Sequence, residues 1–247
     1  MGLQPIYEEQ LLAIVPKFTG AIGFPACCLL MREIYLANNQ GEGNGNPILR
    51  SLAGVAFFLS MTSLGWFLST WAVPEGQFTF ATGNVASCAF QGFLLQVAIG
   101  APLFSVAMAW YFWLVVVFGK TTDDLYRYEK IVSPLIVLYS FISAFLLLGL
   151  DQYNHVGAVC WVMGSPAGCE NSAFHEDLTT PCDRGNWAWA YGVAMFEGMF
   201  HLMREPFFQF NFTTSAAYNK TPILIIFSVY NSRSYFVLHL PNHCVQH

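Results

Sequence analysis

Residues 131–150 read IVSPLIVLYSFISAFLLLGL, twenty consecutive residues without a charged side chain. A helix of about 20 apolar residues is long enough to cross the hydrocarbon core of a bilayer. Uncharged runs also fill residues 51–74 and 76–119, and a run over residues 11–31 contains only Lys17. We therefore expect four membrane-spanning helices, with the Lys17 ammonium reaching toward an interface.

The composition of the whole chain agrees with this pattern. Of the 247 residues, 55% are hydrophobic and 10% are charged, and the formal net charge is −5. An average soluble domain carries about 25% charged residues. The composition excludes ordinary soluble enzymes, and the net charge excludes a basic nucleic-acid-binding surface. We predict an all-α, polytopic transmembrane helical bundle, an integral multi-pass protein whose first partner is the lipid bilayer.

The basic side chains predict the orientation of this bundle. Five of them fall in the two loops expected on one side of the membrane: Arg32, Arg50, Lys120, Arg127 and Lys130. The loops expected on the other side hold only Arg184, in the acidic stretch 151–186. Short loops rich in Lys and Arg stay in the cytoplasm. We therefore expect residues 1–10 to form a short extracellular N-terminus, with the chain in the plasma membrane.

Four cysteines fall in the segments assigned to the outside, where disulfides persist. They are Cys88, Cys160, Cys169 and Cys182, and four cysteines allow three pairings. A zinc site is the alternative, but their spacing lacks the close CxxC pairs that zinc sites usually show. We favour disulfides and expect no bound metal.

The residues around two of these cysteines form a recognisable pattern. Cys88 is followed by Gln91-Gly92-Phe93 at the outer start of the third span, and the pair Cys160-Trp161 follows the fourth span. This arrangement resembles the seven-transmembrane G-protein-coupled receptor superfamily. It is most similar to the branch related to secretin-type and slime-mould cyclic-AMP receptors and to receptor-like proteins of diatoms. The resemblance covers about residues 11–161.

The resemblance implies roles for several residues. A Cys88–Cys160 disulfide would fix the outer loop as a lid over the bundle, and Gln91, Gln96 and Trp161 are the candidate contacts to an unknown extracellular ligand. Hydrogen bonds between helices are the alternative role for the two glutamines, because polar groups in a membrane need partners. The acidic composition of the outer loop would mildly favour cationic ligands.

On the inner side, the resemblance implies contact with a heterotrimeric G protein through residues 119–130. An ordinary solvated loop is the alternative for this stretch, and the residue pattern favours it. Within the third span, Pro102 should break the hydrogen-bond ladder and kink the helix. Gly100 should let another helix approach closely.

The C-terminal part departs from the seven-helix pattern. We place a receptor-like transmembrane bundle at residues 11–187, including the extracellular loop 151–186, and a weak fifth span with an atypical C-terminal region at 188–247. Glu197, His201 and Glu205 recur every four residues and would share one helix face. An amphipathic helix is the favoured explanation, with a metal or proton-relay site as the alternative. The sixth and seventh helices are missing, so the chain is expected to be a truncated or divergent receptor.

Two sequons follow, at Asn211 and Asn219. They could accept glycan only if their segment is extracellular, and a real fifth span would place them in the cytoplasm.

Three classes of function compete on this sequence. The first is a G-protein-coupled-receptor-like signalling protein, with signalling competence in doubt because helices are missing. The alternative is a tetraspanin-like membrane organiser, which would keep its N-terminus inside the cell. A membrane enzyme or transporter is disfavoured because no paired intramembrane carboxylates, HExxH motif or repeated half is visible. We expect no catalytic activity and no cofactor.

Overall fold

The computed structural model describes residues 5–39, 46–166 and 182–186, together with Trp189, Gly192, Val193 and Phe196. The chain divides into two compact units, Met1–Phe207 and Phe208–His247. All the described residues belong to the first unit.

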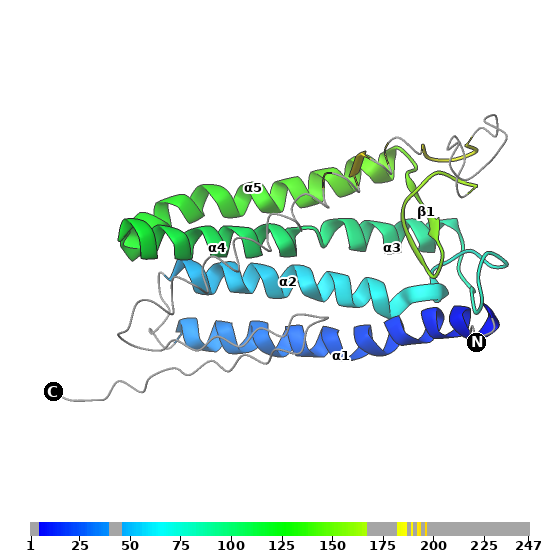
Figure 1. Cartoon of the computed structure of the whole chain (residues 1–247), viewed down its shortest axis with the longest axis horizontal. Helices are drawn as coiled ribbons and strands as arrows, with labels where there is room; N and C mark the ends of the chain where they lie inside the picture. Colours follow the sequence, from blue (N-terminus) through cyan, green and yellow to red (C-terminus); the bar gives the residue numbers. More distant parts are fainter. Residues whose placement is uncertain are drawn as a thin grey trace. The chain divides into compact units, whose positions relative to one another are not determined.

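Five α-helices, one 3-10 turn and one hairpin make up the described part of the chain (Figure 1). In chain order they are α1 (Pro5–Asn39), α2 (Pro47–Leu68), η1 (Ser69–Trp71), α3 (Val85–Val97), α4 (Gly100–Phe118), α5 (Thr122–Gly149), β1 (Tyr153–Val156) and β2 (Val159–Val162). Four helical stretches are long and apolar enough to cross a membrane: Glu9–Ala37, Pro47–Trp71, Val85–Phe118 and Thr122–Gly149. The four expected spans are therefore confirmed as helices of sufficient length and hydropathy.

The helix of the third span is interrupted at Ala98 and Ile99, between α3 and α4. Pro102 has no N–H to donate to the carbonyl oxygen of Ala98, four residues earlier. That oxygen instead accepts a hydrogen bond from the Ala101 N–H at 3.0 Å. The prediction that Pro102 interrupts the ladder is confirmed, and the interruption falls one turn before the proline.

The start of α5 differs from the expectation. Residues 119–130 were predicted as a loop, yet the helix begins at Thr122. A capping box begins it: the Thr121 hydroxyl accepts from the Asp124 N–H, and the Asp124 carboxylate accepts from the Thr121 N–H at 3.2 Å. The Thr-x-x-Asp spacing is itself typical of the start of a helix. The predicted start of the span rested on the charged residues alone, and so it fell too late in the chain.

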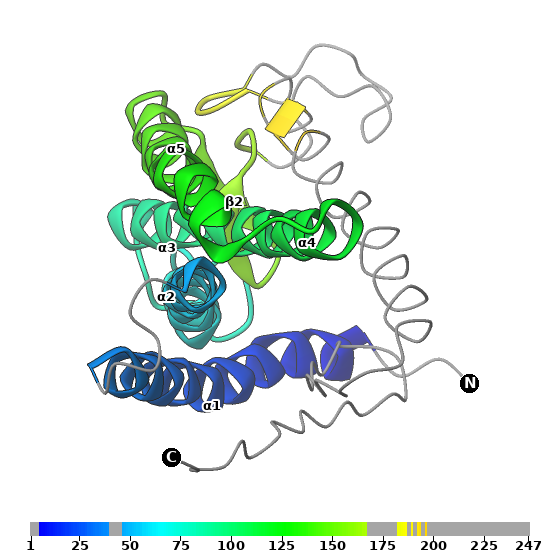
Figure 2. The same cartoon turned by 90° about the vertical axis from the view of Figure 1, so that its left-hand side faces the viewer.

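Helix α2 lies at the centre of the bundle. It packs against α1, α3, α4 and α5, while α5 also contacts α3 and α4; Figure 2 shows α2 among these helices with α1 on its outer side. Phe58 on α2 stacks on Phe104 with ring centroids 5.8 Å apart. A Cβ on Gly100 would lie 2.6 Å from the Phe58 ring, so this glycine does allow the close helix approach that the sequence predicted.

The outward surfaces of these helices are apolar. Phe18 and Ile22 on α1 are 67% and 70% exposed, and Ile131 and Phe145 on α5 are 65% and 60% exposed. Side chains of this kind would be costly in water over such an area. They are what a helix surface facing lipid requires.

Small residues and one ammonium group hold α1 on α2. A Cβ on Gly20 would meet the backbone of Phe67 and would lie 2.5 Å from the Ser63 carbonyl oxygen. The Lys17 ammonium donates to the Thr70 hydroxyl at 2.7 Å and lies 4.7 Å from the centre of the Trp71 ring. Lys17 therefore reaches η1, directly after α2, where it gains a hydrogen bond to a hydroxyl and a cation–π contact.

Replacement of Gly20 by alanine should loosen α1. The new methyl group meets backbone rather than a flexible side chain, so we expect a loss of about 1–3 kcal/mol of unfolding free energy from overpacking. Thermal unfolding in detergent measures this. Gly149→Ala is the control, because nothing lies within 4 Å of a Cβ there. Equal unfolding temperatures for the two variants would contradict the packing described.

Candidate functional site

A two-stranded antiparallel hairpin covers the end of the bundle that also holds η1 and the start of α3 (Figure 1). This end is called the hairpin end below. The hairpin was not predicted, because the stretch 151–186 was expected to be an extracellular loop in an all-α protein. Its turn is formed by Gly157 and Ala158 between paired Val156 and Val159. Gly157 has a φ of +63°, which glycine adopts without strain.

A disulfide joins this hairpin to the first turns of α3. Cys88 and Cys160 are bonded, with their Cα atoms 5.2 Å apart. The two residues are 2% and 0% exposed and pack with Val73. This is the bridge that the family resemblance implied. It also removes these two thiols from any zinc site.

Gln91 holds the same junction through three hydrogen bonds. Its side-chain nitrogen donates to the carbonyl oxygens of Gly65 and Ser69 at 2.9 and 3.1 Å. Its side-chain oxygen accepts from the Cys160 N–H at 2.8 Å. The residue is 0% exposed. One amide therefore connects the end of α2, α3 and the hairpin in a place where each polar group needs a partner.

Two further contacts seat the hairpin. The Trp161 indole N–H donates to the side-chain oxygen of Gln96 at 3.1 Å. The Tyr153 hydroxyl donates to the Ala144 carbonyl oxygen at 3.0 Å, and its ring lies where a Cβ on Gly92 would come within 2.6 Å. Trp161 is thus bound to α3, and Tyr153 bridges α3 and α5.

The three candidate ligand contacts are therefore brought together by the structure. Gln91 and Gln96 are 0% and 1% exposed, and both accept hydrogen bonds from the hairpin. The interhelical role proposed for Gln91 is present, because it bonds α2 from α3. A ligand could reach either glutamine only after the hairpin moved, and ligand contact by these residues stays a prediction.

Beyond the hairpin, the chain comes back into contact with this end of the bundle at Arg184. The Ser165 N–H donates to the Arg184 carbonyl oxygen at 2.7 Å, and the Arg184 guanidinium pairs with the Asp151 carboxylate at 3.0 Å. Burial lowers the pKa of His155, on β1, below its usual range. The imidazole is consequently neutral at pH 7 and can donate one hydrogen bond.

Replacing Gln91 by leucine should loosen the attachment of the hairpin to α3. The Gly65 and Ser69 oxygens keep second donors, the N–H groups of Ser69 and Ala72. The Cys160 N–H, in contrast, loses its acceptor while buried, at a cost of about 1–3 kcal/mol. We expect a lower unfolding temperature and faster reduction of Cys88–Cys160 by a mild thiol.

The control for this prediction is Gln77→Leu, since Gln77 is exposed and should change neither property. An unchanged reduction rate in the Gln91 variant would show that its side chain does not hold the hairpin.

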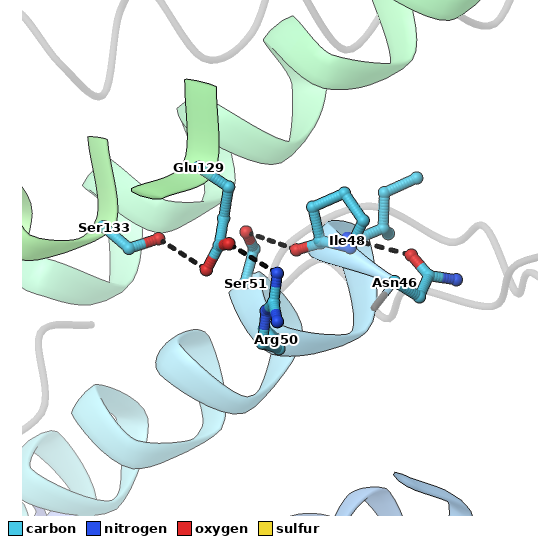
Figure 3. Close-up of polar contacts among 7 residues, drawn as sticks. Asn46, Ile48, Arg50, Ser51, Glu129 and Ser133 are labelled. Carbon is cyan, nitrogen blue, oxygen red and sulfur yellow. Dashed lines mark hydrogen bonds and ion pairs between the residues drawn. The ribbon is translucent and has the colours of Figure 1, made fainter. Parts of the chain in front are cut away.

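The opposite end of the bundle contains an ion pair that joins α2 to α5 (Figure 3). The Arg50 guanidinium lies 2.7 Å from the Glu129 carboxylate, and the Ser133 hydroxyl donates to the same carboxylate at 3.4 Å. Arg50 and Lys130 both lie against the Tyr126 ring, at 4.8 and 4.2 Å from its centre. Sequence reasoning used Arg50 only for orientation and placed Glu129 in a loop, so it missed this pair.

Two buried polar atoms at this end, one of them on Arg50 itself, have no hydrogen-bond partner in the part of the chain that the structure describes. Among the described residues, neither the Arg50 Nε nor the Tyr111 hydroxyl has a hydrogen-bond partner, and Tyr111 is 0% exposed. A buried hydroxyl of this kind costs about 1–3 kcal/mol when it stays unpaired. The opposite end is therefore less completely satisfied than the hairpin end.

The two halves of the Arg50–Glu129 pair should differ in their effect on stability. The Glu129 side chain is 11% exposed and that of Arg50 is 37% exposed. Arg50→Gln leaves a mostly covered carboxylate, whereas Glu129→Gln leaves an arginine that can extend to water. Loss of one partner costs about 3–5 kcal/mol when the pair is fully buried. The exposure of Arg50 makes the cost smaller here.

We expect Arg50→Gln to lower the unfolding temperature more than Glu129→Gln, and the double variant to recover part of the loss. Arg32→Gln is the control, because its contact with Glu33 is exposed on both sides. A larger effect of Glu129→Gln than of Arg50→Gln would contradict the assignment of Glu129 as the buried partner.

Several predicted residues lie outside the described part of the chain: Cys169, Glu197, His201, Glu205, Asn211 and Asn219. Cys182 is described and is disulfide-bonded. The proposed fifth span and the region 188–247 fall mostly outside as well, so these predictions stand as they were made.

Comparisons of this chain with protein-family models, with curated proteins and with solved structures found no match.

Proposed function

We propose that this chain is a receptor-like signalling protein of the plasma membrane, with an extracellular N-terminus and with the hairpin as the lid that responds to a ligand. One observation carries the proposal: the hairpin is bound to α3 by the Cys88–Cys160 disulfide and by Gln91, both buried. A displacement of the hairpin must therefore move the start of α3 or break these bonds.

A path from α3 to the opposite end supports transmission. Helix α3 continues into α4 through the break at Ala98 and Ile99, which can act as a joint because the helical ladder is interrupted there. Tyr111 on α4 is buried next to the region of the Arg50–Glu129 pair and has no hydrogen-bond partner among the described residues. A rearranged packing that brought an acceptor to that hydroxyl would be favoured. Two arrangements of similar free energy are what a ligand can shift between.

Most of the residues proposed to contact the G protein belong to helix α5. Within residues 119–130, the helical turn from Thr122 exposes Arg127 and Lys130, while Leu125 and Glu129 are buried. Exposed basic side chains on a helix suit an acidic partner surface. Contact with a heterotrimeric G protein through this turn is our proposal for the signalling partner.

The proposal predicts acceleration of nucleotide exchange. A purified heterotrimeric G protein should take up a GTP analogue faster with the full chain in lipid nanodiscs than with empty nanodiscs. The assay is run in buffer alone, with acetate as an anionic probe, and with choline as a cationic probe. Arg127→Glu should reduce this effect several-fold by reversing charge at the contact. Arg32→Glu, an exposed reversal on α1, is the matched control and should stay within about twofold of the unmodified chain.

No acceleration under any of these conditions would overturn the signalling proposal. An N-terminal epitope that antibodies reach only after permeabilisation of cells would further support the tetraspanin-like organiser instead, since that class keeps its N-terminus inside.

A further inference from the structure

A small cavity opens at the hairpin end, next to the disulfide. It has a volume of about 130 Å³. The side chains that matter for its chemistry come from the segment before α3, from α3, from β1 and from the returning chain: Gln77, Val85, Asn154, His155, Ser165 and Arg184. One water molecule needs about 10–15 Å³ of such space, whereas drug-sized ligands occupy about 300–1,000 Å³. The cavity therefore suits a molecule of only a few non-hydrogen atoms.

Arg184 and His155 supply hydrogen-bond donors to the lining. Arg184 has five N–H donors in a planar group, and its ion pair with Asp151 uses one of its two terminal nitrogens, Nη2. His155 contributes a neutral imidazole, because burial lowers its pKa. Among the described residues no carboxylate lines the cavity, and the Asp151 side chain is 72% exposed. An anion would meet several donors here and a guanidinium that the Asp151 carboxylate already pairs on one side.

The start of α3 adds to this preference. Val85, the first residue of the helix, lines the cavity. The Asn84 side chain caps the Ser87 N–H, which leaves the N–H groups of Val85 and Ala86 without intrahelical acceptors. The N-terminus of a 13-residue helix carries partial positive charge and favours anions. The helix end, the guanidinium and the imidazole thus act in the same direction.

We propose that this cavity binds a small oxyanion, a carboxylate of about acetate size, with Arg184 as the charged anchor and His155 as a neutral donor. The inference deepens the proposed function and rests on it for the consequence of binding. It differs from the expectation of a cationic ligand, which came from the acidic composition of residues 151–186 as a whole and stays a prediction. The side chains that line the cavity have the opposite character.

Binding there would tighten the lid. Arg184 belongs to the returning chain, Asn154 and His155 to β1, and Val85 to α3, so one anion would connect all three. Asn154 already donates to the Met163 carbonyl oxygen at 2.7 Å, which fixes its place at the cavity edge. A bound ligand would therefore influence the position of α3 through the hairpin, which the disulfide joins to α3.

The test is direct titration of the full chain in nanodiscs by calorimetry, with chloride held constant. The probes are acetate, inorganic phosphate, sulfate and, as the cationic control, choline. We expect acetate to bind and choline not to bind. Arg184→Gln should weaken acetate at least about tenfold through loss of a charged hydrogen bond, while Arg32→Gln, which removes an exposed guanidinium elsewhere, should leave it unchanged.

A second variant protects the test against misfolding. Val85→Asp places a carboxylate in the first turn of α3, which the helix end stabilises, and it should abolish acetate binding by filling the cavity with negative charge. Val85→Asn has the same shape without the charge and should bind within a few-fold of the unmodified chain. If phosphate or sulfate binds and acetate does not, the carboxylate assignment is wrong.

Equal acetate binding by the unmodified chain and by both Arg184→Gln and Val85→Asp would overturn the site. Because no G protein is present, this result is separate from the exchange assay. Acetate binding without acceleration of nucleotide exchange would support the proposed anion site and contradict the proposed signalling function. Acceleration of nucleotide exchange without acetate binding would support the signalling function and contradict the anion site.

Discussion

The structure depends on the side-chain amide of Gln91. A primary amide that is 0% exposed among apolar helices must find partners for both its oxygen and its nitrogen. It finds them on α2, at Gly65 and Ser69, and on the hairpin, at Cys160. The need to satisfy one polar group therefore brings together segments that lie 26 and 69 residues away in the sequence. The disulfide fixes the contact that this amide defines.

The rest of the bundle follows from where polar groups can be paired. Lys17 reaches the Thr70 hydroxyl and the Trp71 ring at the hairpin end, while Arg50 and Glu129 pair at the opposite end. Between these ends the helices meet through small residues and stacked rings, as Gly100 does against Phe58. The hairpin end is held by a covalent bond and several hydrogen bonds, and the opposite end keeps two polar atoms that have no partner among the described residues. This asymmetry is why we place ligand response at one end and rearrangement at the other.

Much of the fold could be predicted from the sequence. Uncharged runs of about 20 residues located the four apolar helices, and Pro102 located the break in the third. The hairpin was missed because its strands are four residues each, too short for periodicity to separate them from a loop. The partner of Gln91 was missed for another reason: Cys160 contributes its backbone N–H, and no side-chain pattern encodes that. Arg50 and Glu129 are far apart in the sequence, so only packing could pair them.

The most direct test of this account is native-state hydrogen exchange of the unmodified chain in nanodiscs. If Gln91 and the disulfide hold the hairpin on α3, the amide of Cys160 should exchange as slowly as the amides of α3 itself, because both open in one cooperative event. The amides of residues 75–82, whose hydrogen bonds, such as those of Gln77 and Ala81, are local to residues 74–83, should exchange much faster. Exchange of the hairpin at the rate of residues 75–82, independent of α3, would contradict the claim that lid and helix move as one unit.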